Sequence, residues 1–583
     1  MAFNFRESAG LNFSDWISVI WHGLRLDLSA GAYIMILPVL ILIFLSFFNG
    51  KSNLILMKIY TFIILFIVLF LGVVDMNLYS YWGFKLDMTP LLYLKTPKEA
   101  IASISFIELG LLTLIFAFLY YLCLILYRNF IAVSLSKVSK RNYLFPVFGI
   151  LFLGLLFIPI RGGFSIAPLN ISSAYFHPNR FANHSAVNVF WNTAYSILEQ
   201  KKLLSFKFME EDKAEKLFEN FYPESDTTIK VIKNHPNVVI ILLESFSNRI
   251  IGELGGEKGI TPELDKICQN SIVFSNFIST GDRSDKGIVG ILSGFPAQPT
   301  TSIINYPSKT ETLPFLLKTF HDKGYYSSFY YGGNINFANF RSYLTNSSMD
   351  RIVTMNDFPS GLNIQKWGVP DEYLFEKILS DIDTIRNPFF IYCFTLSSHD
   401  PYDFPMEPFF GNENIDEKSK SAFYYTDKCL GNFINEAKNK SWWDNTLIII
   451  LSDHGSRSPG QITNNAKAKF EIPMIWTGGA ILNPGTIITK YASQTDIPLT
   501  LLNQFGYENS GYRYSKDIFD PASESFAFYF YNNGFGYVSD STTLIFDNNS
   551  QKYVFVDGGT DTIEYQESAK AYLQVLSTDF NSR

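Results

Sequence analysis

Two apolar segments far apart in the sequence each end in residues that can bind a metal ion. Residues 237–243 are almost entirely Val, Ile and Leu and are followed by Glu244; residues 447–451 are similar and lead to Asp453 and His454. Runs this short and this rich in β-branched residues predict strands buried on both faces of a parallel sheet. Ligands bind beyond the carboxyl ends of such strands. We therefore expect Glu244, Asp453 and His454 to share one mouth of one sheet and to hold a divalent cation.

A serine that could act as a nucleophile lies between these two strands in the sequence. Residues 280–287 read Thr-Gly-Asp-Arg-Ser-Asp-Lys-Gly, and the helix-like apolar run 288–292 follows. Unpaired N–H groups at a helix start favour an anion beside Ser284. Taken alone, Ser284 is more often a helix N-cap, as Glu244 alone is more often a turn cap. The roles are compatible, because a serine bound to a divalent cation loses its proton and becomes an attacking alkoxide.

The elements that must position these residues follow an apolar N-terminal region. The chain has 583 residues, 47% of them hydrophobic, and the excess precedes residue 161. Four uncharged runs there, 28–50, 59–74, 109–127 and 142–160, are each near the length of about 20 residues that spans a bilayer. Residues 1–27 lack the apolar core and cleavage site of a signal peptide. The sequence therefore predicts an integral membrane protein with four candidate spans.

Basic residues predict the orientation of these spans. The connection 128–141 carries Arg128, Lys137, Lys140 and Arg141 and is expected to be cytoplasmic, which places everything after Arg161 outside the cell. The protein is then a multi-pass protein of the cytoplasmic (inner) membrane with an extracytoplasmic C-terminal domain. Counting back through four spans also places the N-terminus outside. Either a further span precedes this sequence, or the segment 16–28 lies in the membrane surface.

Three regions are predicted: a transmembrane domain in residues 1–161, a juxtamembrane connector in 162–234 and a catalytic domain in 235–583. From residue 235 apolar strands alternate with amphipathic helices, which predicts an α/β domain with a mostly parallel central sheet. Residues 525–556 contain aromatic runs broken by Asn-Asn-Gly and Asp-Asn-Asn, which predict a C-terminal antiparallel meander at the sheet edge.

Composition also bounds the partners. The net charge of -7 and the lack of a basic patch interleaved with aromatics argue against nucleic acid. Cys268, Cys393 and Cys429 allow one external disulfide, although Cys393 falls within an expected core strand and reads as a buried thiol. Cys123 falls within a span, and none of the four has the spacing of a zinc or redox motif.

Several of these motifs occur in the order seen in one known family. The residues that carry the resemblance are Glu244, Ser284 within Gly-Asp-Arg-Ser-Asp-Lys-Gly, the segment 293–299 (Ser-Gly-Phe-Pro-Ala-Gln-Pro), Ser398-His399, Ser452-Asp453-His454-Gly455 and Ser493-Gln-Thr-Asp496. Together they resemble the lipoteichoic acid synthase family, which places a sulfatase-like, alkaline-phosphatase-related domain outside the cell after several membrane spans. The resemblance implies the same α-helical transmembrane region and α/β domain for this chain.

The resemblance also implies the metal site and the nucleophile. Glu244, Asp453 and His454 would bind one divalent cation, usually Mn²⁺ or Mg²⁺ in the family, with Zn²⁺ as an alternative. The oxygen of Ser284 would complete the ligand set. Ser284 stands where the family carries a nucleophilic threonine, so the hydroxyl is kept and a methyl group is lost.

Substrate contacts are implied with less detail. His399 corresponds to a family histidine near the substrate, where it would stabilise the phosphate or protonate the leaving alcohol. Lys286 and Arg341 are candidate phosphate-binding residues, although either could be a solvated surface charge. Tyr331 stands where the Gram-positive synthases carry histidine, so the glycerol-phosphate contacts do not carry over as a set.

The implied activity is that of a membrane phosphotransferase. A phosphoglycerol-type headgroup would pass from a membrane phospholipid, with phosphatidylglycerol as the expected donor, through a covalent intermediate on Ser284 to an envelope glycan or glycolipid. The alternatives are a phosphodiesterase or sulfatase-like hydrolase on the same fold, with water as acceptor, and a catalytically inactive scaffold. The segment after Ser284 lacks the x-Pro-x-Arg pattern of a formylglycine sulfatase.

Overall fold

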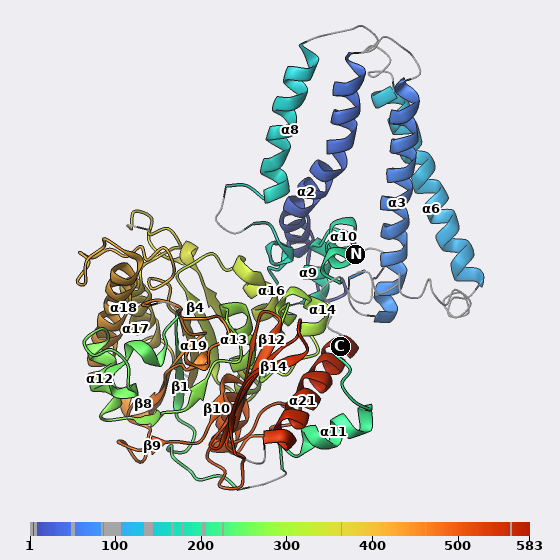
Figure 1. Cartoon of the computed structure of the whole chain (residues 1–583). Coiled ribbons are helices and arrows are strands. Elements are labelled where there is room, and N and C mark those ends of the chain that lie inside the picture. The colour runs from blue at the N-terminus through green and yellow to red at the C-terminus, as the bar shows by residue number, and fades with distance from the viewer. Residues whose placement is uncertain are drawn as a thin grey trace. The chain divides into compact units, whose positions relative to one another are not determined.

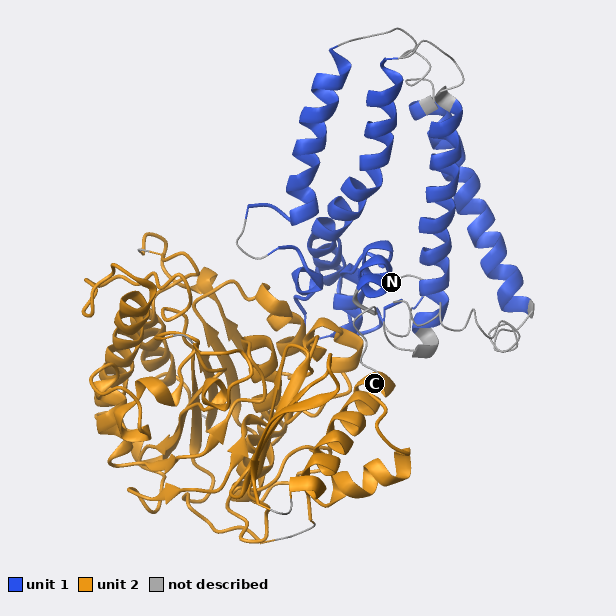
Figure 2. Cartoon of the chain, in the orientation of Figure 1, with its two compact units in different colours: residues 1–202 blue, residues 203–583 orange. Residues whose placement is uncertain are grey.

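The fold is that of a computed structural model of the 583-residue chain. It describes all residues except 1–3, 5–7, 48–52, 83–84, 87–105, 133–143, 165–167, 178, 201–205, 224–226, 363, 387, 461 and 560–561. The chain divides into two compact units, residues 1–202 and residues 203–583 (Figure 2).

Unit 1 is built on long apolar helices (Figure 1). These are α2 (Phe13–Leu45), α3 (Asn53–Trp82), α6 (Phe106–Leu126) and α8 (Phe145–Arg161). Among the described residues, three helices are long and apolar enough to cross a membrane, those at 13–45, 55–79 and 107–131. Each of the four predicted spans overlaps one helix. The segment 142–160, however, forms only the 17-residue α8, which is shorter than a span of the expected length.

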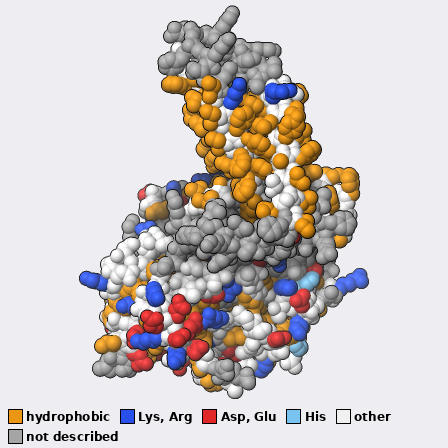
Figure 3. Space-filling view, turned by 90° about the vertical axis from the view of Figure 1, so that its right-hand side faces the viewer, with side chains coloured by type: hydrophobic (Ala, Val, Ile, Leu, Met, Phe, Trp, Pro, Cys, Tyr) orange, Lys and Arg blue, Asp and Glu red, His pale blue; other side chains and the backbone are white. Residues whose placement is uncertain are grey.

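The outward faces of these helices are covered by large apolar side chains (Figure 3). On α6, Ile107 is 86% exposed and Leu114 is 70% exposed. Apolar surface left in water costs about 25 cal/mol per Å² relative to its burial, whereas lipid tails remove that cost. These helices therefore mark the chain as a membrane protein.

The first half of α2 is covered by protein rather than left bare. The segment 16–28 is continuous with the rest of the helix, which starts with a capping box between Asn12 and Asp15. It packs against η2 (Ile171–Ala174) and α9 (Arg180–Ala186), and a Cβ added at Gly23 would lie 2.8 Å from the Ala186 carbonyl oxygen. Of the basic connection 128–141, only residues 128–132 are described, so Lys137, Lys140 and Arg141 lie outside the described residues.

Unit 2 contains an eight-stranded sheet in the order β5-β4-β6-β1-β7-β8-β2-β9. The strands are β1 (Asn237–Leu243), β2 (Ile272–Phe274), β4 (Tyr326–Tyr331), β5 (Arg351–Val353), β6 (Phe389–Phe394), β7 (Thr446–Ser452), β8 (Met474–Thr477) and β9 (Ile487–Ile488). The strands from β5 to β7 pair in parallel, and β8 runs antiparallel to both of its neighbours. The predicted mostly parallel central sheet is confirmed.

Helices cover both faces of this sheet because its central strands are apolar throughout. Side chains of β1 alternate between two cores: Val238, Ile240 and Leu242 enter one, and Val239, Ile241 and Leu243 enter the other. The first core includes α13 (Ser284–Ser293), α15 (Leu316–Asp322) and α20 (Ile497–Phe505). The second includes α12 (Pro262–Cys268), α17 (Asp371–Ile382) and α18 (Ile415–Ala437). This packing fixes the level at which β1 and β7 end.

The C-terminal meander forms a sheet of its own. It comprises β11 (Phe526–Tyr531), β12 (Gly534–Ser539), β13 (Thr542–Asp547) and β14 (Lys552–Gly558), all antiparallel. The last helix, α21 (Thr562–Ser582), packs its aromatic residues against it, with the Tyr572 and Phe528 rings 3.9 Å apart. The predicted antiparallel C-terminal element is thus confirmed. All four cysteines are free thiols, and Cys393 is buried in β6.

Candidate active site

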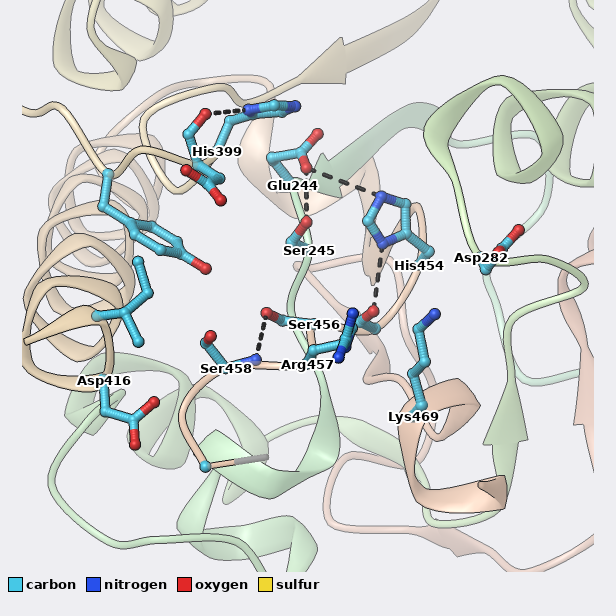
Figure 4. Close-up of a pocket in the computed structure, with 15 residues that line it drawn as sticks. Glu244, Ser245, Asp282, His399, Asp416, His454, Ser456, Arg457, Ser458 and Lys469 are labelled. Carbon is cyan, nitrogen blue, oxygen red and sulfur yellow. Dashed lines mark hydrogen bonds and ion pairs between the residues drawn. The ribbon is translucent and has the colours of Figure 1, made fainter. Parts of the chain in front are cut away.

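Three side chains converge where β1 and β7 end. The two strands are parallel neighbours, and Leu243 pairs with Ser452, so Glu244 and Asp453 leave the sheet at the same level. The Nε2 of His454 lies 3.4 Å from Oδ2 of Asp453 and 3.9 Å from Oε1 of Glu244. One ligand atom from each of the three residues lies within 4.8 Å of the others. Figure 4 shows the side chains of Glu244 and His454 facing each other.

Backbone donors hold the Asp453 carboxylate on one side only. Its Oδ1 accepts from the N–H groups of Ser245 and His454, both at 2.8 Å. Its Oδ2 is buried and has no hydrogen-bond donor. A buried carboxylate oxygen without a donor is costly unless a cation lies beside it. Two carboxylates and an imidazole around that oxygen are hard and borderline ligands that suit Mn²⁺, Mg²⁺ or Zn²⁺.

The electrostatics of Glu244 agree with a cation-binding role. Burial, and then the negative Asp453 carboxylate, raise the pKa of Glu244 to about 8. The Oγ of Ser245 donates to Oε1 of Glu244 at 2.6 Å, and Ser245 adopts a left-handed backbone (φ 63°) to face it. Two adjacent buried carboxylates repel each other, and a divalent cation bound between them removes that repulsion.

Ser284 is the first residue of α13, and the start of that helix lies directly on the Asp453 backbone. A Cβ added at Gly287, one turn after Ser284, would lie 2.2 Å from the Asp453 carbonyl oxygen. Only glycine permits this approach. Ser284 itself is 7% exposed. The structure thus brings the predicted nucleophile segment against the segment that carries two of the predicted metal ligands.

A cavity of about 450 Å³ opens over the cluster. It is lined by Glu244, Ser245, Asp282, His399, Asp400, Tyr402, Ile415, Asp416, His454, Gly455, Ser456, Arg457, Ser458, Gly460 and Lys469. Figure 4 shows Asp416 on the opposite side of the cavity from Lys469 and Asp282. Carboxylates therefore lie at both ends of the cavity, and Lys469 lies at the end that carries Asp282.

His399 faces this cavity from the segment after β6. Its Nδ1 lies 2.7 Å from the Asp400 carbonyl oxygen, and its ring packs on Trp367 with ring centroids 4.1 Å apart. A hydrogen bond through Nδ1 leaves Nε2 to exchange a proton with a ligand. His399 therefore lines the cavity over the cluster, and its role toward a substrate stays a prediction.

The two predicted phosphate-binding residues do not line the cavity. Lys286 is 8% exposed and pairs with Asp282 at 3.0 Å. Burial raises the pKa of Asp282, but the Lys286 ammonium lowers it, and the pKa of Asp282 ends below its ordinary value. Arg341 lies in α16 (Phe340–Thr345), where its Nε donates to Asn336 at 3.1 Å, and burial lowers its pKa.

Two basic residues that sequence reasoning missed do line the cavity. Lys469, in α19 (Lys467–Phe470), is only 6% exposed, and its ammonium donates a long hydrogen bond of 3.4 Å to Oδ1 of Asn464. Burial lowers the pKa of its ammonium, although the nearby Asp282 carboxylate acts in the opposite direction. Arg457 lies on the loop between His454 and α19. The sequence feature that could have identified these two residues is the run 454–470, which contains three Lys or Arg residues and no Asp or Glu.

Tyr331 lies close to the same cluster. It ends β4 beside Phe394, its ring stacks on that residue at 5.3 Å, and it is 2% exposed. Burial, and then the Glu244 and Asp453 carboxylates, raise its pKa. A phenol therefore occupies this strand end as a neutral group beside the carboxylates.

Comparison with known proteins agrees with this geometry. The Sulfatase family model matches residues 236–507. The chain is 24% identical over 303 residues to lipoteichoic acid synthase 2 of Bacillus subtilis, which is 47% of this chain and 46% of that protein. It is 27% identical over 311 residues to lipoteichoic acid synthase of Staphylococcus aureus, which is 48% of this chain and 47% of that protein. The chain spans about half the length of the curated relatives it matches.

Solved structures show the same fold. A protein of the alkaline phosphatase superfamily from Vibrio parahaemolyticus superposes with a TM-score of 0.57 at 25% identity, covering 66% of this chain and 98% of that one. The lipoteichoic acid synthase LtaP from Listeria monocytogenes superposes with a TM-score of 0.54 at 18% identity, covering 64% and 98%. Residues 236–507 therefore match the Sulfatase family model and have the fold of a protein of the alkaline phosphatase superfamily, in a chain similar to the lipoteichoic acid synthases.

Proposed function

We propose that this protein is a metal-dependent phosphotransferase that moves a phosphoglycerol-type headgroup from a membrane phospholipid to an envelope glycan or glycolipid. The observation that carries the proposal is the meeting of three segments: Glu244 and Asp453 at neighbouring strand ends, and the start of α13 packed on the Asp453 backbone. The lipoteichoic acid synthases among its relatives support this choice of reaction. Phosphatidylglycerol is the donor we expect.

Glu244, Asp453 and His454 would hold one divalent cation, with the Ser284 oxygen as a fourth ligand. The bare Oδ2 of Asp453 supports a cation at this position. Bound there, Mn²⁺ or Mg²⁺ supplies a Lewis acid, which makes a coordinated hydroxyl acidic and offsets negative charge on phosphoryl oxygens.

In the first half-reaction Ser284 Oγ attacks the headgroup phosphorus as the alkoxide, having already lost its proton to solvent, while His399 is protonated. The Ser284 O–P bond forms, the P–O bond to diacylglycerol breaks, and the leaving alkoxide takes a proton from His399. Lys469 and Arg457 face the cavity and balance charge on the phosphoryl oxygens. The product is a phosphoglyceryl ester of Ser284.

In the second half-reaction an acceptor hydroxyl attacks the same phosphorus. His399, now neutral, takes the proton of that hydroxyl, the bond from phosphorus to Ser284 Oγ breaks, and the serine oxygen is released for another cycle. The same acid and base groups serve both steps because the second is chemically the reverse of the first with a new alcohol.

Anchoring of the protein in the membrane agrees with a phospholipid donor. A phospholipid is confined to the membrane plane, and the apolar helices of unit 1 keep the catalytic unit on the same membrane. We assign unit 2 to the extracytoplasmic side of the cytoplasmic membrane because Arg128 and three further basic residues lie in the connection 128–141.

A hydrolase with water as acceptor is the second candidate, because the same site would serve it. To separate the two, the full-length protein in detergent is incubated with Mn²⁺ and headgroup-labelled phosphatidylglycerol, with and without an acceptor glycolipid. We expect a labelled Ser284 peptide by mass spectrometry, and transfer that depends on the acceptor. Headgroup release at the same rate without acceptor would establish the hydrolase, and full activity in Ser284→Ala would overturn the mechanism.

A further inference from the structure

One buried side chain joins the segment that leads to Ser284 with the segment that carries Asp453. Gln494 is fully buried, with 0% of its surface exposed. Its Nε2 donates to the carbonyl oxygens of Ser452 at 2.8 Å and of Asp453 at 2.7 Å. Its Oε1 accepts from the N–H of Thr280 at 2.9 Å. All three partners are backbone groups, so the amide ties together two chain segments rather than two side chains.

The two carbonyls need this amide. The pairing of β7 with β8 ends at Leu451, one residue before Ser452, so β8 supplies no donor to the carbonyls that follow. A buried carbonyl without a donor costs about 1–3 kcal/mol. Only Asn and Gln offer two N–H donors and an oxygen acceptor without charge, and Gln494 uses both kinds of group.

Thr280 connects the Gln494 amide to Ser284, because its N–H donates to that amide and it lies only four residues before Ser284. Its carbonyl accepts from the N–H of Phe530 at 2.9 Å, and its Oγ1 accepts from the N–H of Ala297 at 3.0 Å. With Gln494 on its own N–H, Thr280 is held on three sides. The short segment 281–283 then leaves little freedom between this fixed residue and the start of α13.

Two glycines of α13 let the helix lie on the same clamp. A Cβ at Gly287 would lie 2.2 Å from the Asp453 carbonyl oxygen, which is one of the two oxygens that Gln494 holds. A Cβ at Gly290 would lie 3.4 Å from the Cβ of Gln494. The helix that begins with Ser284 therefore packs against the Gln494 side chain at Cβ and against the Asp453 carbonyl that the Gln494 amide holds.

We propose that Gln494 is a positioning residue, whose amide sets where the Ser284 hydroxyl stands relative to the cluster of Glu244, Asp453 and His454. The inference rests on the proposed function, in which the Ser284 oxygen joins that ligand set. Loss of the amide leaves every ligand in the chain. It frees the Asp453 backbone and the Thr280 segment to move apart, so the serine separates from the cluster.

The chain contains a matched control in Gln504, ten residues further on. Its Oε1 accepts from the N–H of Val231 at 2.9 Å, and its Nε2 donates to the Ile229 carbonyl at 2.8 Å and to Thr228 Oγ1 at 3.0 Å. Gln504 is 4% exposed and does not line the cavity over the cluster. Gln504→Glu removes the same kind of donors as Gln494→Glu, from a clamp that holds no site residue.

The test places a thiol at the nucleophile position. Ser284→Cys in the full-length protein in detergent is titrated with Cd²⁺, because a thiolate bound to this soft ion gives an ultraviolet sulfur-to-metal charge-transfer band. The protein with Ser284 intact is the blank for the other cysteines. Gln494→Glu and Gln504→Glu are then added to Ser284→Cys, and thermal unfolding checks that each variant is folded. If Gln494→Glu does not fold, Gln494→Met is measured in its place.

We expect the band in Ser284→Cys, its loss when Gln494→Glu is added, and its retention with Gln504→Glu. In the background with Ser284 intact, Gln494→Glu should weaken Mn²⁺ binding by about tenfold or less, because the three protein ligands remain. A band that survives Gln494→Glu, or that is lost equally with Gln504→Glu, overturns the positioning role and leaves the proposed function standing. A band absent from Ser284→Cys itself overturns the proposed function.

Discussion

The cavity over the cluster has two walls that are built differently. One wall is made by strand ends: Glu244, which lines the cavity, and Asp453, which is buried next to Glu244, follow paired strands, are 2% and 0% exposed, and are held by backbone N–H groups and Ser245. The other wall is made by loops, by the short helix α19 and by the first turn of the long helix α18, which supply His399, Asp416, Arg457 and Lys469. Its side chains reach the cavity from three separate segments.

The difference separates two tasks. A sheet fixes its strand ends through hydrogen bonds along every strand, so ligand atoms placed there keep their spacing without substrate. Loops carry the side chains that recognise what enters, and loops change more readily than sheets. We infer that the strand-end wall supplies the chemistry shared with phosphatases and sulfatases, and that the loop wall selects the headgroup.

The most direct way to break the strand-end wall is Asp453→Asn. The change keeps the shape of the side chain but removes the charge and can place an N–H₂ where a ligand oxygen stood. We expect kcat/KM for headgroup transfer to fall by about a thousandfold or more, with Mn²⁺ content lost in metal analysis of the purified protein. Asp416→Asn, on the loop wall, is the control and should keep its metal. Metal content equal to wild type in Asp453→Asn would contradict the ligand assignment.

His399→Phe tests the loop wall while keeping an aromatic ring against Trp367. Because phenylalanine cannot exchange a proton, we expect kcat for a natural phospholipid donor to fall by about a hundredfold. A donor with a strongly acidic leaving alcohol needs no proton and should lose little. The measurement is the ratio of the two losses. Equal losses for both donors would assign His399 to binding rather than to proton transfer.

Lys469→Met removes the buried ammonium with little change in side-chain length. We expect kcat/KM to fall by several tens of fold, or about 2–3 kcal/mol, as for a lost donor to a phosphoryl oxygen. Lys467→Met is the matched control, because Lys467 bonds to Tyr491 and Glu471 and does not line the cavity. Steady-state kinetics with an anionic donor compare the two. A loss as large in Lys467→Met would point to damage of α19 rather than to a lost phosphate contact.

The strand-end wall could be predicted from the sequence, because one physical rule covers it. A short β-branched run predicts a buried parallel strand, and parallel strands in one sheet end on the same side, so Glu244 and Asp453 had to meet if β1 and β7 were neighbours. In the structure β1 and β7 are parallel neighbours and Leu243 pairs with Ser452, so the two strands end at the same level.

The loop wall could not be predicted in the same way. Lys469 enters the cavity because a four-residue helix turns it inward, and no periodic pattern encodes so short an element. Lys286 and Arg341 were assigned to phosphate from their charge, but Lys286 pairs with Asp282 and Arg341 donates to Asn336, and neither basic side chain lines the cavity. Gln494 was visible only as part of a motif, since its three backbone partners are set by tertiary packing.

The smallest effect that we expect is a dependence of Mn²⁺ binding on pH, which distinguishes Glu244 of the strand-end wall from the carboxylates of the loop wall. Burial and the Asp453 carboxylate raise the pKa of Glu244 to about 8 in the metal-free protein, above the ordinary value of the unfolded chain. The folded state therefore holds this proton longer, and its contribution to stability is present at low pH and is lost as pH rises toward about 8. A bound cation must displace the proton, so we expect affinity for Mn²⁺ to rise by at most about tenfold per pH unit below that value.

Thermal unfolding with and without Mn²⁺ measures this effect. The increase in Tm caused by Mn²⁺ should grow between about pH 6 and pH 8 and then level off. Glu244→Gln carries no proton to displace, so the increase in that variant should be smaller and should lose most of its pH dependence. Asp416→Asn, which changes a carboxylate of the other wall, should retain the wild-type profile. If the increase in Tm depends on pH as steeply in Glu244→Gln as in wild type, the displaced proton belongs to another group. Glu244 and Asp453 would then both be ionised in the protein before a cation binds.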